Sequence, residues 1–189
     1  MQNIAVLGLP RSGKSTLCSK MFAKIQHRCI FVNTQWENYF PEALRVDNWI
    51  KGKLMNYFSQ NQKINLMLFK RNQIWDMLRE IWYFQRSQIH CLPVTVFIDE
   101  CHLFIPKHFN LFDESDDKAA LLLEIFTLGL RFNLRLIIIS QKPQFVCNDV
   151  FNLCESMIIF KLHPRDITYF KKHNIYLPLI NEKYKYVIL

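Results

Sequence analysis

The chain has 189 residues, of which 50% are hydrophobic, 21% are charged and 14% are aromatic. Disordered, collagen-like and low-complexity classes of protein are excluded, because this length is typical of one domain and the apolar fraction is sufficient for a buried core. The formal net charge of +8 favours a polyanionic partner or an anionic membrane surface. No apolar run approaches the ~18 residues of a membrane span. The N-terminus also lacks the basic region of a signal peptide, so we expect an intracellular protein without a transmembrane segment.

The apolar pattern predicts strands and helices that alternate along the chain. In order, they are a strand at 3–7, a helix at 14–25, a strand at 29–33, short helices at 39–44 and 49–58, a strand at 64–69, a helix at 73–85, a strand at Val94–Ile98, a helix at 119–132, a strand at Leu134–Ser140, a short helix at 148–153, a strand at 156–162, a helix at 164–173 and a strand at 184–189. This alternation indicates an α/β fold with a mostly parallel central sheet and helices on both faces. Because the sequence contains no repeat or linker, we expect a single domain over residues 1–189.

The loop between the first strand and the first helix carries a phosphate-binding motif. Residues 8–15 read GLPRSGKS and match G-x-x-x-x-G-K-[ST] at every fixed position, in the strand-to-helix context that the motif requires. In such a loop the backbone N–H groups surround a β-phosphate, Lys14 reaches the β- and γ-phosphates, and the Ser15 hydroxyl binds Mg²⁺. The sequence therefore predicts an ATP site, with Gly8, Arg11, Ser12, Gly13, Lys14, Ser15 and Thr16 as the nucleotide-binding residues.

Two adjacent acids, Asp99 and Glu100, follow the apolar strand Val94–Ile98. Acids at the end of a buried strand are costly unless they serve a cation or a reaction. We interpret Asp99 as a Mg²⁺ ligand together with Ser15, and Glu100 as the base that activates the attacking water. A P-loop kinase has to exclude water rather than activate it, so Glu100 favours hydrolysis. A solvated acidic pair at a strand end is the structural alternative.

The motifs together resemble the HerA and FtsK class of P-loop ATPases, and within that class the small genome-packaging ATPases of double-stranded DNA viruses, including the poxvirus-type and internal-membrane phage enzymes. Four segments carry the resemblance, which extends over residues 3–172. They are the phosphate loop, IDECHLFIP at 98–106, GLRFNLRLIIISQKP at 129–143, and VFNLC followed by IIFKL within 150–162. The resemblance implies a P-loop NTPase fold of the RecA-like kind.

The same resemblance implies roles for two residues outside the phosphate loop and the acid pair. Gln141 would sense the γ-phosphate or orient water, and Arg131 would act as an arginine finger in a neighbouring subunit, with Arg135 and Arg11 as substitutes. Each role has a simpler alternative, because a glutamine can end a strand and a basic residue is favoured in the last turn of a helix by the helix dipole. The chain departs from cellular members after the second strand, where only Glu37 matches their usual Gly-Glu pair.

For function, the resemblance implies a homo-oligomeric ring that hydrolyses ATP with Mg²⁺ and translocates double-stranded DNA into a viral capsid, in the host cytoplasm and in association with the virion. Its docking partner would be a capsid vertex protein or an internal membrane protein. The second hypothesis is a morphogenesis or secretion ATPase similar to the zonula occludens toxin proteins of filamentous phages, whose acid-pair segment is similar but which usually carry a membrane segment. A small P-loop kinase is the third, and Glu100 and the lack of an arginine-rich lid argue against it.

Basic residues that could contact DNA lie in two regions of the chain. They are Lys51, Lys53, Lys63, Lys70 and Arg71, interleaved with Trp49, Tyr57 and Phe58, and Lys171, Lys172, Lys183 and Lys185 near the C-terminus. A surface that follows a DNA backbone has this composition, and so does an ordinary solvated basic face.

The six cysteines include no CxxC pair, and four of them lie on or beside apolar strand-like segments. A free thiol behaves there as a small hydrophobic group, so we expect reduced cysteines. The pairs His90-Cys91 and Cys101-His102 flank an apolar strand that would hold them at opposite ends, and we therefore expect no zinc site.

Overall fold

The computed structural model describes residues 2–34, 40–67, 70–88, 91–173, 175–177, 180, 182 and 185–189. The strands are β1 (Ile4–Leu7), β2 (Arg28–Asn33), β3 (Leu44–Val46), β4 (Lys63–Met67), β5 (Val94–Ile98), β6 (Leu134–Ser140), β7 (Ser156–Ile159) and β8 (Val187–Ile188). The helices are α1 (Lys14–Lys24), α2 (Leu54–Gln60), α3 (Gln73–Ser87), α4 (Asp117–Leu128), α5 (Asn148–Asn152) and α6 (Pro164–Lys172), with short 3₁₀ helices at Cys101–Leu103, Gly129–Phe132 and Pro143–Phe145.

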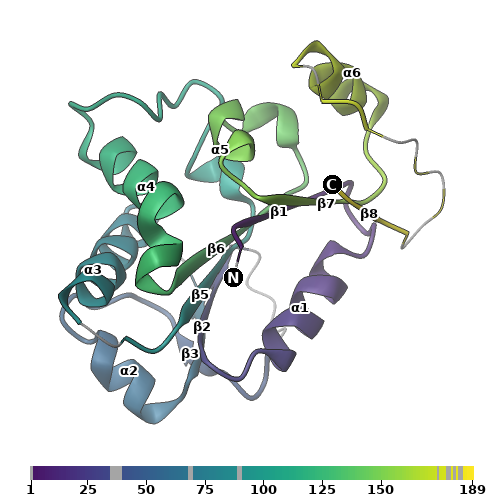
Figure 1. Ribbon diagram of the computed structural model, residues 1–189. Coiled ribbons are helices and arrows are strands. Elements are labelled where there is room, and N and C mark those ends of the chain that lie inside the picture. The colour runs from purple at the N-terminus through teal and green to yellow at the C-terminus, as the bar shows by residue number, and fades with distance from the viewer. Residues whose placement is uncertain are drawn as a thin grey trace.

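Within these residues one eight-stranded sheet runs in the order β3-β4-β2-β5-β6-β1-β7-β8 (Figure 1). Every neighbouring pair is parallel except β7 and β8, which are antiparallel. The parallel strands therefore all end at one edge of the sheet, called here the carboxyl edge, and all begin at the opposite amino edge. The predicted mostly parallel α/β sheet is confirmed.

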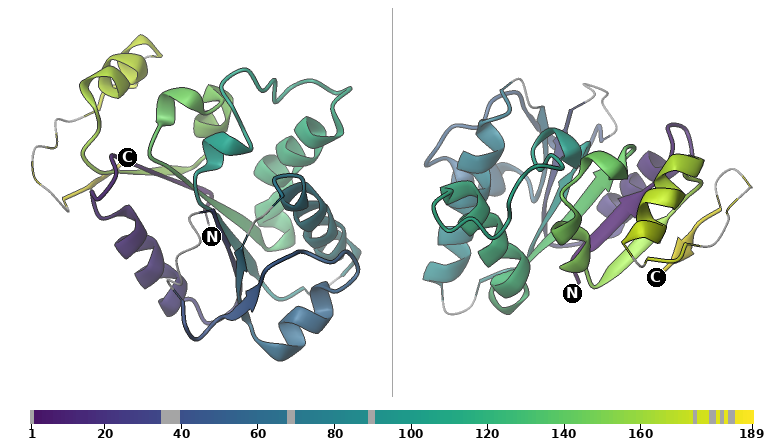
Figure 2. Two further views of the ribbon diagram at one scale, coloured as in Figure 1. Left: turned by 180° about the vertical axis from the view of Figure 1, so that it is seen from behind. Right: turned by 90° about the horizontal axis from the view of Figure 1, so that it is seen from above.

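Helices cover both faces of the sheet, as predicted, but unequally. Helix α1 lies on one face, and α3 and α4 lie on the other (Figures 1 and 2). Side chains alternate between the two faces along each strand, as the pleat of a strand requires. Val6, Phe31 and Phe97 pack toward α1 in one apolar cluster, whereas the larger cluster on the other face includes residues of α2 to α6.

An aromatic cluster fixes α1 to its face of the sheet. Phe22 of α1 meets Phe31 and Phe97 edge to face, with ring centroids 5.9 Å and 5.8 Å apart, and Phe31 stacks on Phe97 at 5.4 Å. Such pairs add about 0.5–1.5 kcal/mol each beyond the burial of their area. The cluster holds the helix whose first turn follows the phosphate loop.

The segment after β2 differs from the prediction. A helix was expected over 39–44, but residue 39 lies outside the described residues and the remainder forms a turn that leads into the edge strand β3. This strand has three residues and depends on pairing with β4, a tertiary contact that apolar spacing does not reveal. The helix expected over 49–58 begins only at Leu54, after Gly52 with φ 81°. Trp49 lies outside the helix, is buried and donates its indole N–H to Glu80 (2.9 Å).

Three other predicted elements end early or shift. The helix expected over 119–132 includes Asp117, and its α-helical part stops at Leu128, where Gly129 begins a 3₁₀ turn. The strand expected over 156–162 ends at Ile159, and β8 is shorter than the expected 184–189. The strand expected over 64–69 corresponds to β4, Lys63–Met67, and the last two residues of the prediction, 68 and 69, lie outside the described residues. The remaining predicted elements agree with the structure within two residues at each end.

Candidate nucleotide-binding site

The loop between β1 and α1 has a backbone that favours glycine at both ends. Gly8 has φ 156° and Gly13 has φ 112°, values that residues with a side chain rarely adopt. A Cβ atom at Gly8 would lie 2.6 Å from Cβ of Phe160, so the loop passes directly against the chain beyond β7. The backbone N–H of Leu9 donates to the carbonyl of Lys161 (2.8 Å) and fixes the loop there.

The remaining loop residues prepare the N-terminus of α1 for an anion. Arg11 has φ 59° and is exposed, Ser12 is buried, and Ser15 and Thr16 are exposed in the first helical turn. That turn contains no acidic residue. Its N–H groups and the helix dipole therefore favour a bound phosphate.

Lys14 lies inside the loop rather than extending into solvent. Its ammonium Nζ donates to the carbonyls of Gly8 and Leu9, each at 2.7 Å, and the residue is 4% exposed. Burial lowers the pKa of Lys14 to about 8, although the charges of Glu100 and Asp99 act in the opposite direction. The lysine, the loop and the acid pair therefore share one electrostatic environment.

The acid pair occupies a sharp turn at the end of β5. Asp99 and Glu100 are both buried, and the backbone N–H of Asp99 donates to the carbonyl of Val32 on the adjacent β2 (3.1 Å). The carboxylate of Asp99 accepts a hydrogen bond from the N–H of Glu100 (3.0 Å). Glu100 has φ 49° and ψ 48°, a left-handed conformation that costs energy in a residue with a side chain and is concentrated at functional sites.

His102 lies beside this turn, and the sequence analysis assigned it no role. Its Nδ1 atom is 3.3 Å from Oε2 of Glu100. Burial lowers the pKa of His102, the charge of Glu100 raises it, and Lys142 and Arg71 lower it further. The sequence feature that could have pointed to His102 is the D-E-x-H spacing, in which the histidine follows the second acid by two residues.

Gln141 follows β6 at the same carboxyl edge, half-buried. It lines a cavity of about 210 Å³ together with Leu9 and Pro10 of the phosphate loop, and with His163 and Asp166 at the start of α6. Gln141 therefore faces the phosphate loop, where a role toward a terminal phosphate is geometrically possible. That role remains a prediction.

The donor set fits a magnesium ion that is bound together with a nucleotide. Ser15 and Asp99 offer a hydroxyl and a carboxylate, and Mg²⁺ typically takes one or two protein oxygens in addition to phosphate oxygens and water. Among the described residues no group of three or more His, Cys, Asp or Glu side chains forms a metal site. These residues therefore suit a metal that arrives with phosphates better than a bare ion.

The arginine candidates lie in different places. Arg131 is exposed in the 3₁₀ helix that precedes β6, at the amino edge. The seven residues of β6 place it on the order of 20 Å from the phosphate loop of its own chain. Arg135 donates to Oγ1 of Thr95 (3.0 Å) inside the sheet, whereas Arg11 is exposed on the loop itself. Arg131 therefore lies out of reach of the phosphate loop of its own chain.

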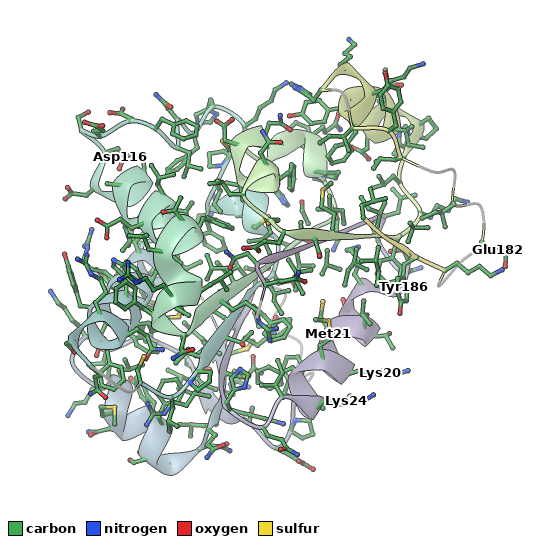
Figure 3. All side chains as sticks on the ribbon, in the orientation of Figure 1. Lys20, Met21, Lys24, Asp116, Glu182 and Tyr186 are labelled. Carbon is green, nitrogen blue, oxygen red and sulfur yellow. The ribbon has the colours of Figure 1, made fainter. Side chains whose placement is uncertain are left out.

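The basic regions provide a less continuous surface than the sequence pattern suggested. Trp49 and Phe58 are buried, so these interleaved aromatics belong to the core. Lys63 donates to the carbonyl of Ala23 (2.7 Å), and Lys185 pairs with Glu182 (2.7 Å). Lys51, Lys53, Lys70, Arg71, Lys171 and Lys172 are exposed, and Lys183 lies outside the described residues. On the outer face of α1, Lys20 and Lys24 point away from the sheet (Figure 3).

All six cysteines are free thiols, and burial raises the pKa of four of them with particular strength: Cys18, Cys29, Cys101 and Cys154.

Two residues named in the sequence analysis, His90 and Glu37, lie outside the described residues. Of the helices that the structure describes, none is both long and apolar enough to cross a membrane.

Solved structures with a similar fold include an NTPase and two ATPases. The genome-packaging NTPase B204 of Sulfolobus turreted icosahedral virus 2, in complex with ATP-gammaS, aligns with a TM-score of 0.72 at 12% identity, over 99% of this chain and 91% of that one. EssC (ATPases 2 and 3) of Geobacillus thermodenitrificans aligns at 0.60 and 11% identity, over 100% of this chain and 37% of that one. EccC (ATPases 2 and 3) of Thermomonospora curvata, in complex with a signal sequence peptide, aligns at 0.57 and 14% identity, over 96% and 32%. No protein-family model and no curated protein matches the sequence. At these identities the likeness establishes a P-loop NTPase fold.

Proposed function

We propose that this chain is a Mg²⁺-dependent ATPase that moves double-stranded DNA, most directly into a viral capsid. The observation that carries the proposal is the position of Lys14. Its ammonium is held by the carbonyls of Gly8 and Leu9 and lies in the field of both Asp99 and Glu100. A phosphate-binding cation, a metal-binding acid and a candidate base thus meet at one edge of the sheet.

In the proposed reaction, the loop N–H groups and Lys14 hold the β- and γ-phosphates. Ser15 and Asp99 would hold the magnesium ion, which would neutralise part of the negative charge that develops on the phosphates. Glu100 takes the proton of the attacking water, and Gln141 orients that water or contacts the γ-phosphate. Because Arg131 cannot reach its own site, it acts in the site of a neighbouring subunit.

The extent of the structural match favours genome packaging over secretion. This chain spans 91% of the viral packaging NTPase B204 but only 32% of the EccC ATPase fragment. The net charge of +8 suits a polyanion such as DNA. The proposed assembly is a homo-oligomeric ring that docks on a capsid vertex or an internal membrane protein, in the host cytoplasm and at the virion.

The likeness to EccC, which was solved with a signal sequence peptide, supports a secretion or morphogenesis ATPase as the second candidate. Such an enzyme would hydrolyse ATP in the same site. It would respond to a protein substrate rather than to DNA, so the polymer that stimulates hydrolysis separates the two candidates.

The test is steady-state ATP hydrolysis with and without double-stranded DNA, at several protein and salt concentrations. We expect Mg²⁺-dependent turnover that DNA stimulates, DNA affinity that falls steeply with salt because phosphate contacts dominate, and little dependence on DNA sequence. Lys14→Ala is the control and should reduce turnover to background while the protein stays folded. Unchanged turnover in folded Lys14→Ala would refute the nucleotide site, and absence of DNA binding at low salt would refute the translocase.

A further inference from the structure

The turn after β5 brings His102 to the side chain of the proposed base. Glu100 has a left-handed backbone and is followed immediately by the 3₁₀ helix Cys101–Leu103, in which Leu103 N–H donates to the carbonyl of Glu100 (2.9 Å). Cys101 between them is completely buried and anchors the turn in the core. As a result, Oε2 of Glu100 and Nδ1 of His102 lie 3.3 Å apart, close enough for an electrostatic contact but without the alignment of a hydrogen bond.

Both side chains are shielded from water at this contact. The side chain of His102 is 15% exposed and that of Glu100 is 11% exposed. The charged groups that act on the ring besides Glu100 are Lys142, which follows β6, and Arg71, which follows β4. The histidine therefore lies where three loops of the carboxyl edge meet.

The chemistry of a neutral histidine suits this position. Burial and the two cations keep the pKa of His102 below its ordinary value, so the ring is uncharged at neutral pH. An uncharged ring with its proton on Nδ1 can donate one hydrogen bond to a carboxylate and leave its negative charge intact. A lysine or arginine at this distance would instead stabilise the ionised carboxylate strongly and weaken it as a base.

From this geometry we infer that His102 is the positioning residue of Glu100. A small rotation of the ring aims its Nδ1–H at Oε2, and the hydrogen bond formed in this way orients the carboxylate so that the other oxygen takes the proton of the attacking water. The inference rests on the proposed function, because it assigns Glu100 the role of base. It adds a residue that acts through the base and contacts neither the nucleotide nor the metal.

The first test needs no hydrolysis. In ¹⁵N-histidine NMR spectra of the full chain, the His102 signal, identified by its loss in His102→Phe, should show the Nδ1–H tautomer. That preference should weaken in Glu100→Leu, which removes the acceptor. A ring with its proton on Nε2 in the wild-type protein would overturn the inference even if the enzyme hydrolyses ATP. If the enzyme proves inactive, the tautomer still decides whether His102 holds Glu100.

The second test compares two substitutions of His102. In Asn, the amide nitrogen is attached to Cγ, as Nδ1 is in histidine, so His102→Asn keeps a donor near the same place, whereas His102→Phe keeps a ring and removes the donor. We expect His102→Phe to lower kcat by about 10–100-fold, the range typical when a supporting hydrogen bond is removed, with KM unchanged. His102→Asn should recover most of that loss at an equal melting temperature. Equal loss of kcat in both variants would overturn the positioning role.

The third test asks whether His102 acts through Glu100. In a Glu100→Gln background, His102→Phe should have little further effect on kcat, because the base that it positions is already absent. A purely structural role predicts the same fractional loss in both backgrounds. Additive effects would therefore contradict the inference, whereas Lys14→Ala provides the inactive baseline for both measurements.

Discussion

The carboxyl and amino edges belong to the same parallel sheet, yet their polar residues are organised differently. At the amino edge, Asn3 is fully buried, accepts a hydrogen bond from the N–H of Leu136 (2.9 Å) and donates to the carbonyl of Phe126 (3.2 Å). Arg135 and His27 both contact Oγ1 of Thr95. These groups hold the strands together.

At the carboxyl edge, the buried polar residues Lys14, Asp99 and Glu100 belong to the candidate nucleotide site. Of the described residues other than glycine, three have positive φ: Arg11, Glu100 and Asn133. Asn133, at the amino edge, is a residue type that tolerates this conformation, whereas Arg11 and Glu100 are not. Backbone strain and buried charge thus coincide where the nucleotide is proposed to bind. The polar residues of the amino edge stabilise the sheet, whereas those of the carboxyl edge form the candidate site, whose strain and buried charge the rest of the sheet has to support.

We expect the strongest loss of activity from a change at the amino edge, Arg131→Ala, because Arg131 is the residue of that edge with a proposed catalytic role. An arginine finger is worth about 10³–10⁵ in rate where it is established, so Arg131→Ala should lose nearly all ATP hydrolysis. Arg131→Ala keeps its own phosphate loop, and Lys14→Ala keeps its arginine. Mixing the two inactive variants should therefore restore activity at mixed interfaces in a steady-state assay.

Normal hydrolysis by Arg131→Ala, at protein concentrations where the oligomer forms, would show that Arg131 has a structural role and no catalytic one. A cap on the helix dipole would then be its only effect, worth about 0.3–1 kcal/mol of stability. The exposed Arg11 would become the leading substitute, because Arg135 is engaged with Thr95.

At the carboxyl edge, Glu100→Gln removes the base and keeps the shape of the side chain. Turnover should fall by about 10²–10⁴-fold, as is typical for the loss of a general base, while ATP still binds. Single-turnover hydrolysis and nucleotide affinity, measured on the same preparation, separate the two effects. Loss of ATP binding with normal turnover per bound site would show that the roles of Asp99 and Glu100 are exchanged.

The matching change at the amino edge is Asn3→Ala, which should affect stability and leave chemistry intact. It strands the N–H of Leu136 and the carbonyl of Phe126, at about 1–3 kcal/mol for each buried group. Denaturant unfolding should therefore show a loss of about 2–6 kcal/mol in the free energy of unfolding, with kcat unchanged where the protein remains folded. The neighbouring exposed residue supplies the control, since Gln2→Ala should change stability by no more than about 0.5 kcal/mol.

The buried ammonium of Lys14, at the carboxyl edge, should make ATP affinity depend weakly on pH. Lys14 has a pKa of about 8, and a bound phosphate raises it, so the protonated form binds ATP more tightly. ATP affinity should therefore fall by about tenfold between pH 7 and pH 9. Lys14→Arg keeps its charge over this range, and its residual affinity should not fall. A wild-type affinity that is flat over these two pH units would contradict the lowered pKa.

The elements best predicted from sequence are those with the least ambiguous ends. The strands Val94–Ile98 and Leu134–Ser140 agree with the structure at both ends, because each is a run of mainly apolar residues that stops at a polar one. The three-residue β3 could not be predicted, since it exists only through pairing with β4. Trp49 was misassigned to a surface because its burial depends on a hydrogen bond to Glu80, 31 residues away in the chain.

The residues of the candidate site also include some that could be predicted from sequence and some that could not. The phosphate loop and the acid pair have fixed spacing, so their residues could be named from sequence and lie together at the carboxyl edge. His102 could not be assigned, because its contact with Glu100 depends on a left-handed residue followed by a 3₁₀ turn. The partner of Arg131 cannot be found within one chain, because the strand β6 separates it from its own phosphate loop.

The contact between Gly8 and Phe160 has a mechanical consequence. The phosphate loop touches the chain beyond β7 through the first side-chain carbon of Phe160, and the hydrogen bond from Leu9 to Lys161 lies beside that contact. Three residues later the same segment begins α6. The start of α6 is therefore tied to the phosphate loop by a short stretch of chain, with backbone contacts rather than long side chains at the junction.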